Sequence, residues 1–136
     1  SSGFYFCTKD EYVSIAAELS KITTVVTPNR LEAEILFGLK GGDQQTGIKS
    51  TGHFSHILIK GGHFEKKMND FFYANGKGVW IHGSNKEFRK DRRGTGCRLS
   101  TAIACFLTEG SSLEESIRRA KKYLEKMCEK VGHTFS

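Results

Sequence analysis

The chain has 136 residues and a formal net charge of +6 at pH 7, with 38% hydrophobic and 26% charged residues. This composition is typical of a globular protein, and we expect residues 1–136 to form a single domain with a modest core. No apolar run approaches the roughly 20 residues of a membrane-spanning helix, and no secretory signal pattern is present. We therefore expect a cytoplasmic protein without a membrane partner. Its 4 cysteines form no C-x-x-C pair, which argues against a structural zinc site.

The N-terminal region predicts a helix followed by a short strand. Thr8 and Glu11 have the spacing of a capping box, which indicates a helix that extends to about Ser20. The β-branched run Thr23–Val26 then predicts a buried strand that ends before Pro28. Apolar residues at helical spacing predict the buried face of the helix: Tyr12, Val13, Ala16, Ala17 and Leu19.

A second capping pair follows this strand. Asn29 is a favoured N-cap residue and Glu32 stands three positions later, so another helix should begin there. Ligands of open α/β sheets bind beyond the carboxyl ends of strands, where both side chains are expected. A carboxylate at that place suits Mg²⁺, which keeps several waters; the alternative is that the pair only caps the helix. The predicted apolar face of this helix is Leu31, Ile35, Leu36 and Leu39.

The middle of the chain predicts a strand and a hairpin. The run His56–Lys60 is typical of a strand buried on both faces, and two glycines close it. Lys60, at the end of this strand, is placed to reach a phosphate, unless it is simply a solvent-exposed lysine before a turn. Two apolar runs then flank Asn75-Gly76, a dipeptide that strongly favours a two-residue hairpin turn.

The segment Gly94-Thr95-Gly96-Cys97 is the most informative part of the chain. A glycine-rich turn that opens a helix presents free N–H groups and the positive end of the helix dipole, which together hold phosphate. Cys97 falls in the first turn, where the dipole favours a thiolate, so it is a candidate base or nucleophile. The alternative is a glycine turn that only packs a helix closely against a strand.

The basic run Lys86–Arg93 leads into this glycine turn. It fits a solvated loop, a lid over a polyphosphate ligand, or a nucleic-acid contact, and we expect no nucleic-acid partner.

Two helices complete the predicted α/β fold. One extends to about Glu109 and stops at Gly110, and the other begins near Ser112 with Glu115 completing a capping box. Cys105 and Cys128 are predicted to be small buried residues. The predicted packing positions are Leu99, Ile103, Phe106 and Leu107 in the first helix, and Leu113, Ile117, Ala120, Leu124, Met127 and Val131 in the second.

Three segments in this order resemble one family. Val25–Glu34, Ile57–His63 and Gly94–Ser100 are similar to the hydroxymethylpyrimidine and phosphomethylpyrimidine kinases of thiamine biosynthesis, members of the ribokinase-like superfamily. The resemblance extends from Ser2 to about Val131 and matches the C-terminal half of such an enzyme. It implies a partial ribokinase-like three-layer sandwich, a sheet between helices, with a β-hairpin.

The resemblance also implies transfer of the γ-phosphate of ATP to a hydroxymethylpyrimidine or its monophosphate. Cys97 matches the general base of the family, and its anion hole for the transferring phosphoryl group is matched by Gly94, Thr95 and Gly96. Two positions depart from the usual pattern: Arg98 stands where threonine is usual, and Arg92-Arg93 where Thr-His is common.

Three further residues match nucleotide and metal positions of the family. Asn29 and Glu32 match an Asn-x-x-Glu motif that organises Mg²⁺ and phosphates, with Glu32 on the metal side. Lys60 matches a lysine near the nucleotide.

Two alternatives to this pyrimidine kinase remain open. One is a pyridoxine or pyridoxal kinase of the same superfamily, and the other is a non-catalytic remnant that binds phosphate ligands or serves in assembly. For a full-length kinase we expect a homo-oligomer, and for the isolated chain we expect no kinase activity.

Overall fold

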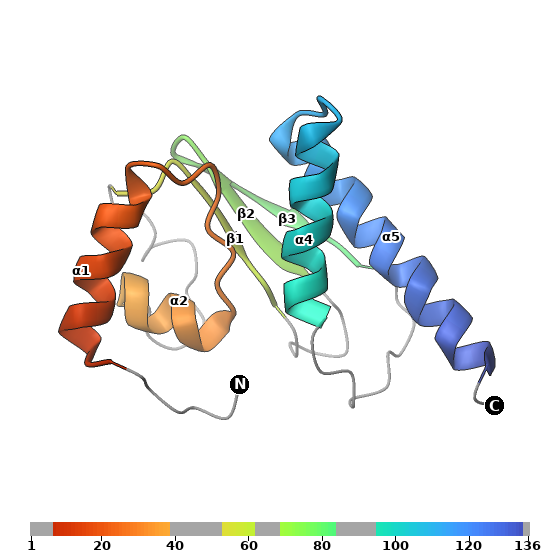
Figure 1. Ribbon diagram of the computed structural model, residues 1–136, viewed down its shortest axis with the longest axis horizontal. Helices are drawn as coiled ribbons and strands as arrows, with labels where there is room; N and C mark the ends of the chain where they lie inside the picture. Colours follow the sequence, from red (N-terminus) through yellow and green to blue (C-terminus); the bar gives the residue numbers. More distant parts are fainter. Residues whose placement is uncertain (1–6, 39–52, 62–68, 84–94, 135–136) are drawn as a thin grey trace. The chain divides into compact units, whose positions relative to one another are not determined.

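The computed structural model describes residues 7–38, 53–61, 69–83 and 95–134 (Figure 1). Contacts divide the chain into two compact units, residues 1–61 with 71–80, and residues 62–70 with 81–136. The described part of the chain combines helices with a three-stranded sheet, in agreement with the predicted α/β class. In chain order the elements are α1 (Lys9–Ser20), α2 (Arg30–Phe37), β1 (His56–Ile59), β2 (Asp70–Ala74), β3 (Lys77–Ile81), α4 (Thr95–Thr108) and α5 (Leu113–Thr134).

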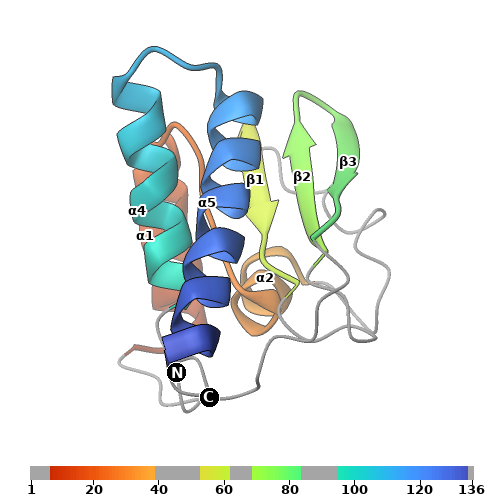
Figure 2. The same cartoon turned by 90° about the vertical axis from the view of Figure 1, so that its right-hand side faces the viewer.

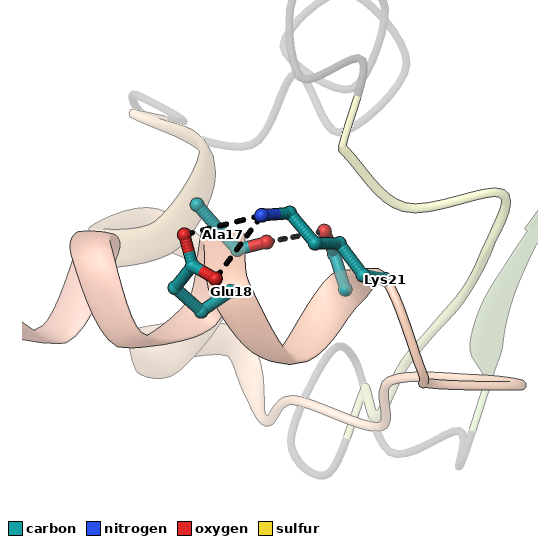
Figure 3. A network of polar contacts seen from close by, with 4 residues as sticks. Ala17, Glu18 and Lys21 are labelled. Atoms are coloured by element: carbon teal, nitrogen blue, oxygen red, sulfur yellow. Dashed lines mark hydrogen bonds and ion pairs between the residues drawn. The ribbon is translucent and has the colours of Figure 1, made fainter.

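Helix α1 begins at the predicted capping box. The Thr8 hydroxyl accepts the Glu11 N–H at 3.2 Å, and the Glu11 carboxylate accepts the Thr8 N–H at 2.8 Å. At the other end, the Lys21 ammonium reaches back to the Glu18 carboxylate at 3.1 Å (Figure 3).

The predicted buried face of α1 is wrong, because none of its residues is buried. Val13 is 38% exposed and Leu19 is 51% exposed. The helix packs beside α2 (Figure 1), and Tyr12 and the alanines are only half-buried. Periodicity located the helix correctly, but it could not tell which apolar residues meet a neighbour within this chain.

The predicted strand Thr23–Val26 is also wrong. Within this segment only Val26 pairs with the region of β1, through an isolated parallel bridge to Ile57, and a second isolated bridge joins Asn29 to Lys60. The backbone carbonyls of Val26 and Pro28 accept N–H groups of the partner segment at 2.8 and 2.9 Å. Since Pro28 has no N–H to donate, the ladder cannot continue as a regular strand.

Helix α2 begins at the predicted Asn29 cap and ends at Gly38, whose φ of 62° is the left-handed conformation of a glycine C-cap. Its predicted apolar face is partly wrong. Leu31 is 61% exposed, whereas Ala33 and Phe37 are buried one turn apart. Ile35 and Leu36 are half-buried, and Leu39 lies outside the described residues.

The core of the first unit joins α2 to β1 and β2. Strand β1 pairs antiparallel with β2, and the strand order is β1-β2-β3. Residues 57–59 are all buried, which confirms the prediction of a strand covered on both faces. The core cluster is Ala33, Phe37, Ile57, Ile59 and Phe71, with Val26, Leu36, Phe54 and Tyr73 packed against it.

The hairpin β2-β3 turns at Asn75-Gly76, as predicted. Both residues have positive φ, 48° and 87°, which a type I′ turn requires. Trp80 of β3 packs edge-on against the Phe71 ring, with 5.1 Å between ring centroids. The backbone at Gly78 lies directly on the same ring, so a Cβ atom there would overlap it.

In the second unit, α4 and α5 pack side by side (Figures 1 and 2). In both helices, part of the predicted apolar stripe is buried. Gly110, which has a φ of 91°, ends α4 as predicted. Of the predicted stripes, Leu99, Ile103, Ile117 and Ala120 are buried, and Phe106, Leu107, Leu113, Leu124 and Met127 are half-buried.

Arg119 stabilises the corner between these helices. Its guanidinium contacts the Glu109 carboxylate at 3.2 Å and lies 4.2 Å from the centroid of the Phe106 ring. Cys105 is exposed, contrary to prediction, because it stands two positions from buried Ile103 and therefore on the opposite side of the helix. The side chains of Cys128 and Val131 lie outside the described residues.

A buried ion pair lies in the same unit. The Lys121 ammonium of α5 contacts the Asp70 carboxylate at the start of β2, and each side chain is 9% exposed. Within the described ranges, none of the helices has the length and apolarity that a membrane crossing requires.

Candidate functional site

The predicted pair Asn29 and Glu32 forms the cap of α2. The Asn29 side-chain oxygen accepts the Glu32 N–H at 2.9 Å, and the Glu32 Oε2 accepts the Asn29 N–H at 2.8 Å. Asn29 and Glu32 therefore form a complete capping box at the N-terminus of α2. Among the described residues, none pairs with the second carboxylate oxygen of Glu32 or with the Asn29 amide NH₂, so these atoms are available to a ligand.

The structure also places Lys60 beside Asn29, the N-cap residue of α2. Its backbone pairs with Asn29 in a parallel bridge, and its N–H donates to the Pro28 carbonyl at 2.9 Å. The side chain is half-buried, and its ammonium has no ion-pair partner in the part of the chain that the structure describes. Lys60 thus follows β1 directly and pairs through its backbone with Asn29, the N-cap residue of α2.

Tyr12 of α1 is a neighbour of this group that the sequence did not reveal as a site residue. Burial raises the pKa of its hydroxyl above the ordinary 10.0, and the charges of Glu32 and Cys7 raise this pKa further. Sequence periodicity assigned Tyr12 only to an apolar face. No local signal could reveal its proximity to Glu32, since the two helices meet through tertiary packing.

The chemistry of this group suits a phosphate ligand. The N-terminus of α2 carries a partial positive charge, and Lys60 adds a full one. Among the described residues, no group of three or more His, Cys, Asp or Glu could hold a metal ion. The one free carboxylate oxygen of Glu32 still fits Mg²⁺ of the kind that is held by few carboxylates, several waters and substrate phosphates.

The second predicted group belongs to the other unit. Thr95, Gly96 and Cys97 are the first residues of α4, so their N–H groups have no partner within the helix; Gly94 lies outside the described residues. The Thr101 hydroxyl donates to the Cys97 carbonyl at 2.9 Å and supports the first turn.

Cys97 is exposed and lines a cavity of about 560 Å³ between α4 and α5. This volume suits a small ligand. The sequence does not predict Tyr123 and Met127 as lining residues of this cavity. Its helical spacing assigns Met127 to core packing, and no sequence motif singles out Tyr123. The lining residues are Cys97, Arg98, Thr101, Ala102, Cys105 and Phe106 of α4, with Tyr123 and Met127 of α5.

Both groups lie within one family match. A model of the phosphomethylpyrimidine kinase family matches residues 1–135 of the chain. The chain belongs to the phosphomethylpyrimidine kinase family. This confirms the resemblance drawn from the three sequence segments.

Comparison with individual proteins supports the assignment of the chain to the phosphomethylpyrimidine kinase family. The hydroxymethylpyrimidine/phosphomethylpyrimidine kinase of Rhizobium meliloti is 36% identical over 132 residues, which make up 91% of this chain and 49% of that protein. The chain therefore spans about half the length of the relatives it matches.

Solved structures show that the fold is ribokinase-like. The pyridoxal kinase of Lactobacillus plantarum matches 100% of this chain and 52% of its own, with a TM-score of 0.78 and 20% identity. The Staphylococcus aureus pyridoxal kinase in complex with AMP-PCP and pyridoxal matches 87% of this chain and 46% of its own, with a TM-score of 0.72 and 26% identity. The predicted fold class is thereby confirmed for this kinase family member.

Proposed function

We propose that this chain forms the part of a hydroxymethylpyrimidine or phosphomethylpyrimidine kinase that binds ATP and Mg²⁺ and supplies the base for phosphoryl transfer. The observation that carries this proposal is the backbone bridge between Lys60 and Asn29, the cap of α2, together with a Lys60 ammonium that has no ion-pair partner among the described residues. The family match and the binding of AMP-PCP by the related Staphylococcus aureus enzyme support it.

Each residue of the first group has a role in this proposal. Lys60 neutralises the nucleotide phosphates, and the Asn29 amide donates to a phosphate oxygen. Glu32 holds Mg²⁺ through water, and the metal, when bound, would neutralise further phosphate charge. Phosphoryl transfer depends mostly on such positioning and charge neutralisation.

Cys97 is the proposed general base. Its sulfur accepts the proton of the substrate hydroxyl, while the hydroxyl oxygen forms a bond to the γ-phosphorus and the bond to the ADP oxygen breaks. The N–H groups of Gly94, Thr95 and Gly96 are the proposed anion hole, which stabilises charge on the transferring group.

Calorimetric titration of the chain with AMP-PCP, at several Mg²⁺ concentrations, tests the nucleotide site. Lys60→Met should weaken binding about 10-fold or more, because one charge-assisted contact is lost. Glu32→Gln should raise the Mg²⁺ concentration needed for binding. Glu11→Gln is the matched control, since Glu11 accepts the N–H of its own N-cap residue at the same 2.8 Å.

Glu32→Gln should change the free energy of unfolding by only a few tenths to about 1 kcal/mol, the cost of a weakened cap, and Glu11→Gln should also have only a small effect. Only Glu32→Gln should shift the Mg²⁺ requirement. If the two variants bind nucleotide alike, Glu32 only caps α2 and the assignment to the metal is wrong.

A second candidate is pyridoxal or pyridoxine phosphorylation, which the matches to pyridoxal kinases favour. Parallel assays with hydroxymethylpyrimidine and pyridoxal separate the two substrates. Since the isolated chain is itself expected to be inactive, these assays use the complete kinase fold, and nucleotide binding there without turnover of either substrate would favour the third candidate, a non-catalytic phosphate-binding or assembly protein.

A further inference from the structure

Helix α1 carries an apolar stripe that nothing in the described structure covers. Ile15, Leu19 and Ile22 follow one another at intervals of four and three positions, so they lie on one face of the helix and its first following turn. They are 53%, 51% and 83% exposed. Single exposed apolar residues are ordinary on protein surfaces, but an aligned set of three indicates a contact surface.

The charges around the stripe narrow the choice of partner. Lys21 is paired with Glu18 at 3.1 Å on the same turn (Figure 3), and Asp10 and Glu11 lie in the first turn of the helix. A helix that binds an anionic membrane has a basic polar face, which α1 does not have. The neutral stripe instead suits an apolar protein surface.

The relatives indicate which protein surface this is. The chain matches 49% of the Rhizobium meliloti kinase and 52% of the Lactobacillus plantarum enzyme, while all of it is matched in the latter comparison. These kinases therefore have about as much chain again outside the matched part. In layered α/β proteins, the apolar stripe of a helix is covered by another layer of the same fold.

We propose that Ile15, Leu19 and Ile22 form the docking surface for the other half of the kinase fold. The partner is the portion that the relatives have outside the matched region, supplied on the same polypeptide or on a separate one. This surface concerns assembly of the fold and is independent of the roles proposed for Lys60, Glu32 and Cys97.

The test compares one substitution in two contexts. The first is the 136-residue chain, and the second is the same chain fused behind the unmatched N-terminal part of the Rhizobium meliloti kinase. Ile15→Lys should leave the Tm of the chain alone nearly unchanged, because the site is exposed. In the fusion it should lower the Tm clearly, because it places a charge in a buried interface. Val79→Lys, at an exposed apolar residue of β3, is the matched control and should alter neither Tm.

Hydroxyl-radical footprinting gives an independent readout. Leu19 and Ile22 should be strongly labelled in the chain alone, at a concentration where light scattering shows a monomer, and protected in the fusion. Equal effects of Ile15→Lys in both contexts would overturn the proposal, as would equal labelling. A fusion that unfolds without a cooperative transition would also count against it, because the two parts would not then form one structure.

Discussion

Two glutamates in this chain make the same local contacts and differ in what surrounds them. Glu11 and Glu32 each complete a capping box with the residue three positions earlier. The Thr8 N–H, and after it the Thr8 hydroxyl, lowers the pKa of the exposed Glu11 below its ordinary value of 4.5. Glu32 is half-buried and lies close enough to Tyr12 for its charge to act on the phenol. Identical local geometry thus serves a helix end in one case and a candidate ligand site in the other.

The first prediction at this scale concerns Cys97. In the active kinase, Cys97→Ala should lower kcat by about 10²–10⁴-fold, the usual cost of losing a general base, with little change in ATP affinity. Steady-state kinetics with varied ATP measure both quantities. Cys105→Ala is a suitable control, since Cys105 lines the same cavity one helical turn beyond Thr101. Near-normal turnover in Cys97→Ala would show that Cys97 lines the cavity without acting as the general base.

The second concerns Tyr12. Its raised pKa means that the folded state keeps the phenol proton at pH values where the unfolded chain has lost it. The associated stability is therefore present below about pH 10, the ordinary tyrosine value, and is lost as pH rises through the folded pKa. Tyr12→Phe should reduce this alkaline loss of stability, measured as Tm against pH. Glu32→Gln should move the Tyr12 titration to lower pH in absorbance at 295 nm.

At the scale of elements, the sequence predicted what depends on neighbours in the chain and failed where distant contacts decide. The caps at Thr8 and Asn29 and the Asn75-Gly76 turn were located correctly, because hydrogen bonds and φ preferences within a few residues determine them. The buried faces of α1 and α2 were misassigned, and so was Cys105. Periodicity gives a helix an apolar side, but which side is covered depends on packing that no local pattern contains.

The candidate site follows the same division. Asn29, Glu32 and Lys60 could be predicted because strand ends and helix starts are visible in the sequence. Tyr12 and Tyr123 could not, since each reaches its site across a helix–helix contact. The strand predicted before Pro28 failed for a further reason: β-branched residues favour extended backbone, but a ladder also needs N–H donors at regular intervals.

The buried pair Asp70–Lys121 leads to a prediction at this scale. Lys121→Met removes the cation that contacts the buried Asp70 carboxylate and should lower the free energy of unfolding by about 3–5 kcal/mol. Replacing both partners, as Asp70→Leu with Lys121→Met, should recover much of that loss. Urea unfolding of the two single variants and the double variant measures the coupling.

Arg118→Met is the control for this series, because Arg118 pairs with Glu114 on the same helix but is 51% exposed. It should cost less than about 1 kcal/mol. Equal losses in Arg118→Met and Lys121→Met would show that burial of the pair contributes nothing.

At the scale of the whole molecule, the chain spans about half the length of the kinases it matches. Strand β3 is an edge strand of the sheet, with its residues 77–80 exposed, and α1 has no buried residue. Exposed edges and apolar stripes favour association. The single-domain expectation and the homo-oligomer remain predictions for the complete fold.

We accordingly predict that the isolated chain does not phosphorylate hydroxymethylpyrimidine and tends to self-associate. Weak phosphate or nucleotide binding at the start of α4 should persist, because that segment is continuous in sequence. Light scattering at increasing concentration measures the association, and a coupled ADP-release assay measures turnover. Phosphorylation of hydroxymethylpyrimidine by a purified, monodisperse monomer would show that residues 1–136 already contain a complete substrate pocket.

The contact between Gly78 and Phe71 has a consequence for mutational tolerance. Gly78 is exposed on an outer strand, where most substitutions cost little. The Phe71 ring beneath it is only 2% exposed and packs in the core, so it has no room to retreat from an added Cβ atom. In a saturation screen for retained folding, position 78 should accept glycine alone, while Lys77 and Val79 on either side accept many residues. Solvent exposure by itself would therefore misclassify this site as permissive.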